Sequence, residues 1–122
     1  MKSSKTIVSG NCKRSLCPVA CMLDVLGDKW TLLVVRDILF GKHTFKVLQQ
    51  SPEKIPSNIL ADRLKRLQQE KIVERTLYQV RPKRYAYKLT EKGLDLKPVM
   101  QSLIAWSNKY NPDTYDMSKM KY

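Results

Sequence analysis

The feature that most constrains the fold is an amphipathic helix pattern followed at once by two strand-like runs. Residues 57–71 carry one narrow apolar stripe of helical spacing, formed by Leu60, Leu64 and Leu67. Residues 72–80 and 84–90 then show the apolar and polar alternation that is typical of strands. Pro82 lies between the two runs, where it favours a turn and removes no ladder hydrogen bond. The sequence therefore predicts a helix followed directly by a β-hairpin.

Three more helices are predicted upstream of this one. Pro18 suits the first turn of a helix over residues 19–26, and residues 29–39 are apolar on nearly every side, as in a helix buried inside a fold. Thr44 can cap a short helix with three side chains expected to face inward, Phe45, Val47 and Leu48. A short helix before the stripe-bearing one is the arrangement of a helix-turn-helix.

A last helix is predicted from a cap at Thr90, with a kink or restart at Pro98, to about residue 110. Its apolar residues outnumber those that one stripe can bury against a small domain, so we expect a subunit interface, the alternative being burial within the monomer. The expected interface residues are Leu96, Val99, Met100, Leu103, Trp106 and Tyr110. A pocket for a small effector could form there beside Met22, although such side chains more often belong to a core.

The chain has 122 residues, enough for one domain, and a net charge of +12. We expect that domain over residues 16–110, between a basic arm (1–15) and a tail (111–122). Residues 61–90 hold nine basic side chains against three acidic ones, half of the net excess. Such a surplus indicates nucleic acid, a membrane surface or merely a solvated face. No window is apolar enough to span a membrane and no secretion signal begins the chain, so a cytoplasmic location is expected.

Two groups of residues favour nucleic acid over a membrane surface or a solvated face. Opposite the leucine stripe, the helix combines small, amide and basic side chains, the mixture that reads base edges in a major groove: Ser57, Asn58, Ala61, Asp62, Lys65 and Arg66. The predicted hairpin tip carries cations suited to phosphates, namely Arg81, Lys83 and Arg84. This order predicts an α+β, mainly α, winged helix-turn-helix with a two- or three-stranded hairpin wing, and duplex DNA as its partner. A homodimer would set two such helices about one DNA turn apart.

Three cysteines, Cys12, Cys17 and Cys21, cluster near the N-terminus. Their odd number argues against a disulfide framework and fits a reducing compartment. Their spacing is not that of a zinc site, and the chain has a single histidine, so no metal or cofactor is expected. They are either small packed side chains or include a redox-sensing thiol. Cys17 is the best candidate sensor, because a helix beginning at Pro18 would favour its thiolate.

Two further classes of function compete with a DNA-binding regulator. A winged-helix RNA or ribonucleoprotein module would have the same charge and fold, but no exposed aromatic platform is predicted outside the hairpin tyrosines. An enzyme is not expected, because the sequence has no paired-carboxylate spacing, no glycine-rich phosphate loop and no nucleophile elbow.

Short motifs spread over three quarters of the chain carry a family resemblance. They are Cys17-Pro18, Gly27-Asp28-Lys29-Trp30-Thr31, Leu39-x-Gly41 with Phe45, Ile55-Pro56-Ser57-Asn58-Ile59-Leu60, Arg63-Leu64 with Leu67, and Pro82…Tyr85-x-Tyr87-x-Leu89-Thr90 with Gly93. Together they resemble the HxlR family of bacterial winged-helix transcriptional regulators, relatives of the MarR-type repressors. The resemblance implies a homodimeric DNA-binding regulator whose terminal helices form the dimer. In some members a cysteine just before the first helix, the place of Cys17, senses electrophiles or oxidants.

The sequence also departs from the family pattern. Where the family often has arginine before the phenylalanine of the short helix, this chain has Thr44, and Val47 replaces an acidic residue. A backbone-positioning contact to DNA is therefore expected to move to Lys42 or Lys46. The additional Cys12 and Cys21 leave open which thiol would respond to an oxidant or to a small molecule.

Overall fold

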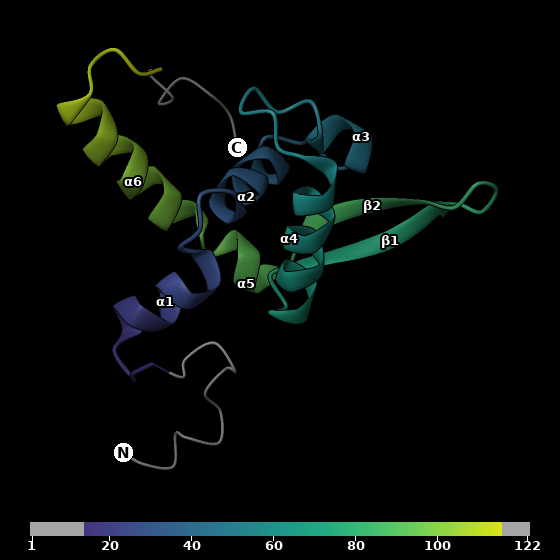
Figure 1. Ribbon diagram of the computed structural model, residues 1–122, viewed down its shortest axis with the longest axis horizontal. Helices are drawn as coiled ribbons and strands as arrows, with labels where there is room; N and C mark the ends of the chain where they lie inside the picture. The colour runs from purple at the N-terminus through teal and green to yellow at the C-terminus, as the bar shows by residue number, and fades with distance from the viewer. Residues whose placement is uncertain (1–13, 116–122) are drawn as a thin grey trace.

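The structure is a computed structural model that describes residues 14–115. Its elements in chain order (Figure 1) are α1 (Pro18–Leu26), α2 (Thr31–Leu39), α3 (Phe45–Leu48), α4 (Ser57–Gln69), β1 (Val73–Gln79), β2 (Arg84–Leu89), α5 (Glu91–Leu94) and α6 (Lys97–Tyr110). This is a mainly helical winged helix-turn-helix, as predicted. Residues 1–13 of the expected arm and 116–122 of the expected tail lie outside the described residues.

Helix α2 lies at the centre of the fold and packs against α4. Val35 on α2 and Leu60 on α4 are 0% exposed, and the other two leucines of the α4 stripe are equally buried. The helix begins at Thr31, two residues later than predicted, because the Asp28 carboxylate accepts the N–H groups of Trp30 at 3.1 Å and Thr31 at 3.2 Å. That side chain satisfies donors of the first turn that have no partner within the helix.

Helix α3 begins as predicted, because the Thr44 hydroxyl accepts the N–H of Val47 at 3.3 Å. The prediction that Val47 faces inward is wrong, since its side chain is 38% exposed. A helix of a single turn directs only i and i+3 toward one surface, here Phe45 and Leu48. The segment before α3 also forms an isolated bridge between Thr44 and Ala86, so β2 has a neighbour on each side although the sheet itself has two strands.

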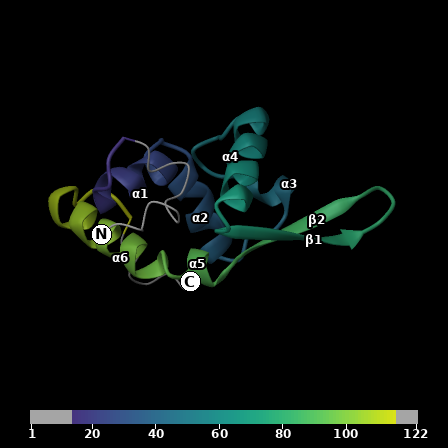
Figure 2. The same cartoon turned by 90° about the horizontal axis from the view of Figure 1, so that it is seen from below.

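Strands β1 and β2 form an antiparallel hairpin that projects from the helical body (Figures 1 and 2). With the connection over residues 80–83 they make up the wing. Only the base of the wing belongs to the core, through Val73 at 2% exposure and Tyr87 at 7%. A bulge between Leu77 and Gln79 interrupts the ladder, and beyond it the wing extends into solvent.

The predicted restart near Pro98 is confirmed by the break between α5 and α6. The Thr90 hydroxyl accepts the N–H of Gly93 at 3.1 Å and caps α5. A Cβ atom at Gly93 would lie 2.3 Å from the Ile72 carbonyl oxygen, so this close approach requires glycine. In both views α1 and α6 lie on the side of the molecule opposite the wing. Within residues 14–115, no helix is long and apolar enough to cross a membrane.

Candidate nucleic-acid interface

One face of α4 is buried and the opposite face is exposed. Five residues, which we call the reading face, are exposed to solvent there: Ser57, Asn58, Ala61, Asp62 and Lys65. Their positions are a direct consequence of the leucine stripe, because a helix that buries i, i+4 and i+7 presents the residues between them to solvent. The reading face therefore offers an amide, a small side chain and an ammonium group to a partner.

An ion pair holds α4 against the start of α2. Arg63 Nε donates to Asp28 Oδ2 at 2.8 Å, and Arg63 also contacts Asp62. Partial burial would raise the pKa of Asp28, but hydrogen bonds from Thr31 and Arg63 outweigh it and lower that pKa from 3.8 to about 2. Arg63 is thus committed to a structural contact, and its side chain is only 17% exposed.

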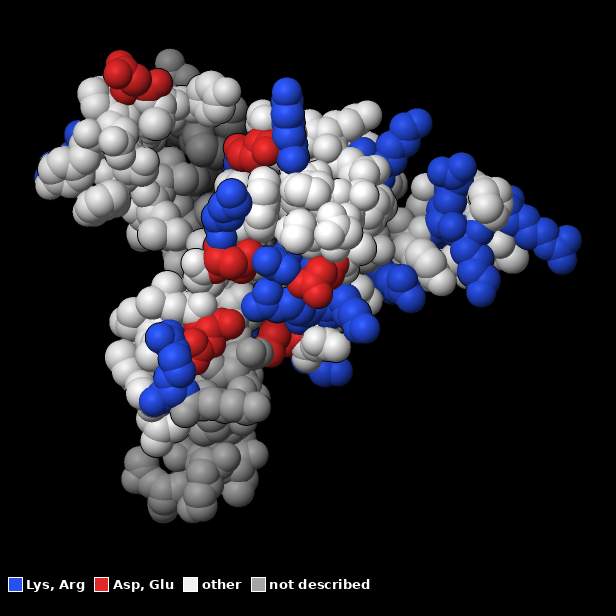
Figure 3. Space-filling view, in the orientation of Figure 1, with Lys and Arg blue, Asp and Glu red and all other residues white. Residues whose placement is uncertain are grey.

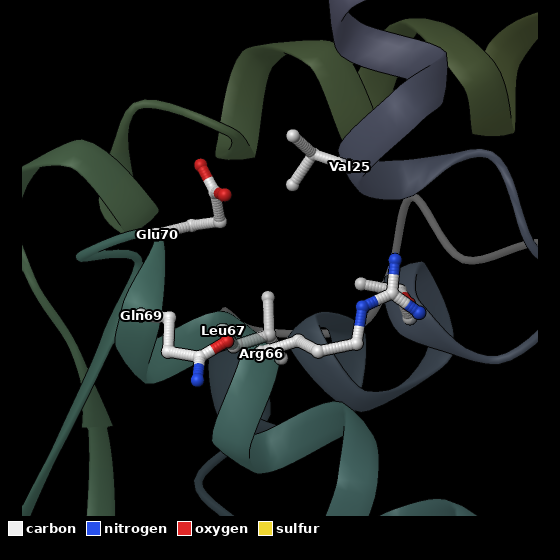
Figure 4. A pocket seen from close by; sticks show the side chains of 6 residues that line it. Val25, Arg66, Leu67, Gln69 and Glu70 are labelled. Atoms are coloured by element: carbon white, nitrogen blue, oxygen red, sulfur yellow. The ribbon is translucent and has the colours of Figure 1, made fainter. Parts of the chain in front are cut away.

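Arg66 lies further around α4 than the reading face. It is half-buried and lines a pocket of about 60 Å³ together with Val25 of α1 and Thr31 of α2. Figure 4 shows its side chain along this pocket beside Leu67. Of the six α4 residues predicted to contact DNA, Arg66 is therefore the one that packs against other helices.

The wing carries the second cluster of predicted contacts. The wing tip residues Arg81, Lys83 and Arg84 are exposed, and Figure 3 shows Lys and Arg side chains gathered over the wing and over α4. The Gln79 side-chain amide donates to the carbonyl oxygens of Arg81 and Pro82, each at 3.2 Å, which closes the turn. The guanidinium of Arg75 lies 3.9 Å from the centre of the Tyr85 ring and stiffens the wing below its tip.

A second ion pair orders the turn between α3 and α4. Arg36 on α2 donates to both carboxylate oxygens of Glu53 at 2.8 and 2.9 Å and also to Asp37. The hydrogen bond from Arg36 lowers the pKa of Glu53 from 4.5 to about 2. Lys46 on α3 is exposed, whereas Lys42 is half-buried just after α2. Lys46 is therefore the more accessible of the two predicted backbone contacts.

The cysteines differ from expectation. Cys21 is disulfide-bonded, so the prediction of reduced thiols is wrong for it: an odd count prevents all three from pairing, but not two. Cys17 is exposed and is the free cysteine of the described residues. It occupies the N-cap of α1, where the backbone N–H groups of Ala20 and Val19 lower the pKa of its thiol. No cluster of metal-binding side chains occurs in residues 14–115.

Helices α1 and α6 leave an apolar surface uncovered. Leu103 is 47% exposed and Trp106 is 66% exposed, and α1 adds Val19 and Leu23. Two of the residues expected at a subunit interface pack within the monomer instead: Met100 is in its core, and Leu96 packs against that core. The exposed apolar residues on the two helices, with one that lies just before α1, are Leu16, Val19, Met22, Leu23, Val99, Leu103, Trp106 and Tyr110.

Sequence reasoning missed the two ion pairs that position α4. Asp28 and Arg63 are 35 residues apart and Arg36 and Glu53 are 17 apart, so no local pattern joins them. The motif Gly27-Asp28-Lys29-Trp30-Thr31 marked the position of Asp28, but not its partner.

Comparison with known proteins identifies the fold's family. Residues 25–115 match the model of the HxlR-like helix-turn-helix family. The chain belongs to this family. It is 34% identical over 97 residues to the transcriptional regulator YodB of Bacillus subtilis, an alignment that spans 79% of this chain and 87% of YodB. Reduced YodB superposes with a TM-score of 0.67 over 81% of this chain and 99% of that one.

The redox regulator HypR in its reduced form gives a TM-score of 0.71 at 31% identity, over 80% of this chain and 95% of HypR. These relatives are transcriptional regulators and not enzymes, which confirms the expected class. The protein is accordingly a transcriptional regulator of the HxlR type with a winged helix-turn-helix fold.

Proposed function

We propose that this HxlR-type regulator binds duplex DNA sequence-specifically, with α4 in the major groove and the wing tip on the flanking backbone. The observation that carries the proposal is the pairing of an exposed reading face with an exposed cationic wing tip, on a helix whose opposite side is buried. Asn58 can pair bidentately with adenine, Ala61 permits close approach, and Lys65 reaches guanine or phosphate.

The second part of the proposal is a homodimer formed through α1 and α6. Its support is the exposed apolar surface on these helices, which includes Trp106 and Leu103. Neighbouring exposed apolar side chains of this kind are typical of protein interaction sites. A two-fold dimer through this side would direct both wings and both reading faces away from the interface. It would bind a palindromic or pseudo-palindromic operator with half-sites about 34–36 Å apart.

Selection of bound duplexes from a random pool tests the specificity. We expect a two-fold symmetric sequence to be enriched, and Asn58→Ala to relax preference at one base pair per half-site by about 1–3 kcal/mol. Equal, weak binding to every sequence would contradict the proposal. A parallel titration with structured and single-stranded RNA at the same salt concentration separates it from the RNA-module alternative, which predicts tighter binding to RNA.

We further propose that Cys17 makes the regulator responsive to oxidants or electrophiles. Its support is an exposed thiol with a lowered pKa at a helix N-cap, together with the similarity to HypR, a redox regulator, and to YodB, whose structure is known also after diamide treatment. Cys17 should be alkylated faster than an unperturbed thiol at pH 7, and an oxidant should change operator affinity in the native protein but not in Cys17→Ser. Unchanged affinity in the native protein would reject this role.

A further inference from the structure

Consecutive carbonyl groups at the C-terminal end of α4 accept hydrogen bonds from the segment that follows the wing. Lys92 Nζ donates to the Glu70 carbonyl oxygen at 2.7 Å, and the Thr90 hydroxyl donates to the Lys71 carbonyl oxygen at 2.6 Å. The backbone N–H of Thr90 donates to the Ile72 carbonyl oxygen at 3.0 Å. We call these contacts the α4 clamp.

The chain leaves α4 through a backbone conformation that its sequence does not favour. Lys71 has a φ of 63°, in the left-handed region that glycine adopts most readily. Its N–H donates to the Gln68 carbonyl oxygen and the next N–H along the chain donates to that of Leu67, which is the Schellman pattern of a helix end. A lysine persists in this conformation where surrounding contacts hold the backbone. The α4 clamp supplies such contacts at Lys71 and at both of its neighbours.

The two donor residues of the clamp lie where the wing, α4 and α6 meet. Thr90 follows β2 directly, Lys92 belongs to α5, and α6 begins at Lys97. Figure 1 shows α5 between α4 and the start of α6. Gly93 brings the backbone of α5 against the Ile72 carbonyl oxygen, the position where a Cβ atom would lie 2.3 Å from it. The end of α4 and the beginning of α6 are therefore joined through one short segment, residues 90–96.

The clamp differs in kind from the packing that holds α6 against the body of the protein. Met100 of α6 is in the core and Ile104 packs against that core, so these contacts are apolar. Apolar contacts are non-directional, whereas a hydrogen bond weakens steeply when its donor and acceptor are no longer aligned. The α4 clamp therefore restrains the angle between α4 and α6 more strictly than the apolar packing does.

We propose that Thr90 and Lys92 are positioning residues that set the angle between α4 and α6, and through that angle the spacing of the two operator half-sites. The inference rests on the proposed homodimer and its binding to DNA. In that dimer α6 belongs to the interface and α4 to the major groove, so the separation of the two copies of α4 depends on the angle. One additional base pair between the half-sites moves them apart by about 3.4 Å and rotates them by about 35° around the duplex axis. A clamped α4 does not follow this change, so the native protein discriminates strictly between spacings.

The binding test uses duplexes that carry the two selected half-sites with one base pair more or one fewer between them. For the native protein we expect either change to lower affinity at least ~10-fold. Lys92→Met keeps the aliphatic stem but loses the donor, so the same changes should lower its affinity only about threefold. Its affinity for a single half-site should stay native, because the reading face is unaltered. If Lys92→Met discriminates between spacings as strictly as the native protein does, the proposal is wrong.

Matched variants separate the clamp from net charge and from folding. Lys71→Met removes an exposed ammonium group from the same end of α4 but keeps the backbone, so its spacing preference should be native. Lys92→Arg keeps a donor and should retain the strict preference. Thr90→Val loses the hydroxyl and should relax the preference, whereas Thr90→Ser should not; if Thr90→Val fails to fold, the variants of the exposed Lys92 decide the test. Equal relaxation in Lys71→Met and Lys92→Met would show that charge sets the preference and would overturn the proposal.

Residual dipolar couplings of the free protein test the clamp without DNA, because they report the orientation of the α4 N–H bonds relative to those of α6. We expect one rigid alignment to fit both helices in the native protein, and Lys92→Met to require a separate alignment with smaller couplings for α6. If one alignment fits both helices equally well in the variant, the clamp does not set the angle and the proposal is overturned. If the couplings change in Lys92→Met but the native protein selects no duplex, the positioning role of the clamp stands and the proposed DNA binding fails instead.

Discussion

At the scale of single residues, Asp28 joins two elements that the chain order keeps apart. Its carboxylate caps the first turn of α2 and pairs with Arg63 on α4. Asp28→Asn keeps a capping oxygen but loses the charge, so we expect the free energy of unfolding to fall by about 1 kcal/mol. Asp28→Ala loses both contacts and should cost about 2 kcal/mol. Urea denaturation measures both, and equal costs would show that the neutral capping oxygen of Asn contributes nothing.

The same carboxylate predicts a pH dependence. The pKa of Asp28 is about 2 in the folded protein against 3.8 ordinarily, so its ionised form favours folding. That stabilisation is complete above about pH 4.5 and is lost as the pH falls through about 4 to 2. Glu53, lowered to about 2 by Arg36, acts in the same direction. Asp28→Asn should therefore show a flatter stability curve than the native protein between pH 4.5 and 2; parallel curves would contradict the assignment.

Two basic residues on α4 should differ in how they affect DNA binding. Lys65 is exposed on the reading face, so Lys65→Gln should lower the slope of log affinity against log salt by about 1. Arg63 is engaged by Asp28, so Arg63→Gln should weaken binding through displacement of α4 while the slope stays unchanged. Salt titrations of the selected duplex measure both variants. A slope reduced by Arg63→Gln would place that guanidinium on a phosphate.

At the scale of elements, the wing should contribute affinity in proportion to its tip charge. Lys83→Ala combined with Arg84→Ala should reduce the salt slope by about 2 and operator affinity by at least ~10-fold at moderate salt. The control Lys2→Ala with Lys5→Ala removes the same net charge from the N-terminal segment. Electrophoretic mobility shifts or anisotropy compare the two pairs, and equal losses would mean that net charge, and not the wing, drives binding.

The elements show which features a sequence can predict. The leucine stripe, the caps at Thr44 and Thr90 and the hairpin around Pro82 follow from contacts within a few residues, and the structure has all of them. Features that depend on distant residues could not be predicted. The Asp28–Arg63 and Arg36–Glu53 pairs arise only when elements pack, since no spacing in the sequence encodes which residues then meet.

The candidate site divides in the same way. The exposed positions of α4 follow from its stripe, so Asn58 and Lys65 were predicted from periodicity alone. Periodicity does not show which basic side chain a neighbouring helix will cover. Arg66, which lines a pocket beside α1, was therefore predicted to contact DNA in the same way as Lys65. Val47 was wrongly predicted to face inward, because helical periodicity does not define a buried face in a helix of only one turn.

At the scale of the whole molecule, the structure separates two surfaces with different chemistry. The reading face and wing tip are polar and cationic, whereas α1 and α6, opposite the wing, expose apolar side chains. This division fits a protein that contacts DNA on one side and a second copy of itself on the other. Dimerisation would supply the two-fold symmetry that one monomer lacks.

The dimer is tested by placing a charge on α6. Leu103 is 47% exposed, so Leu103→Glu should leave the monomer folded while burying an unpaired carboxylate in the proposed interface. We expect the dimer dissociation constant to rise at least ~100-fold by sedimentation, with a matching loss of affinity for two-half-site duplexes but not for a single half-site. The matched control is Leu77→Glu, on the wing at 46% exposure, which should remain dimeric. If Leu103→Glu sediments as the native protein does, α6 is not the interface, and the apolar surface must be covered in some other way.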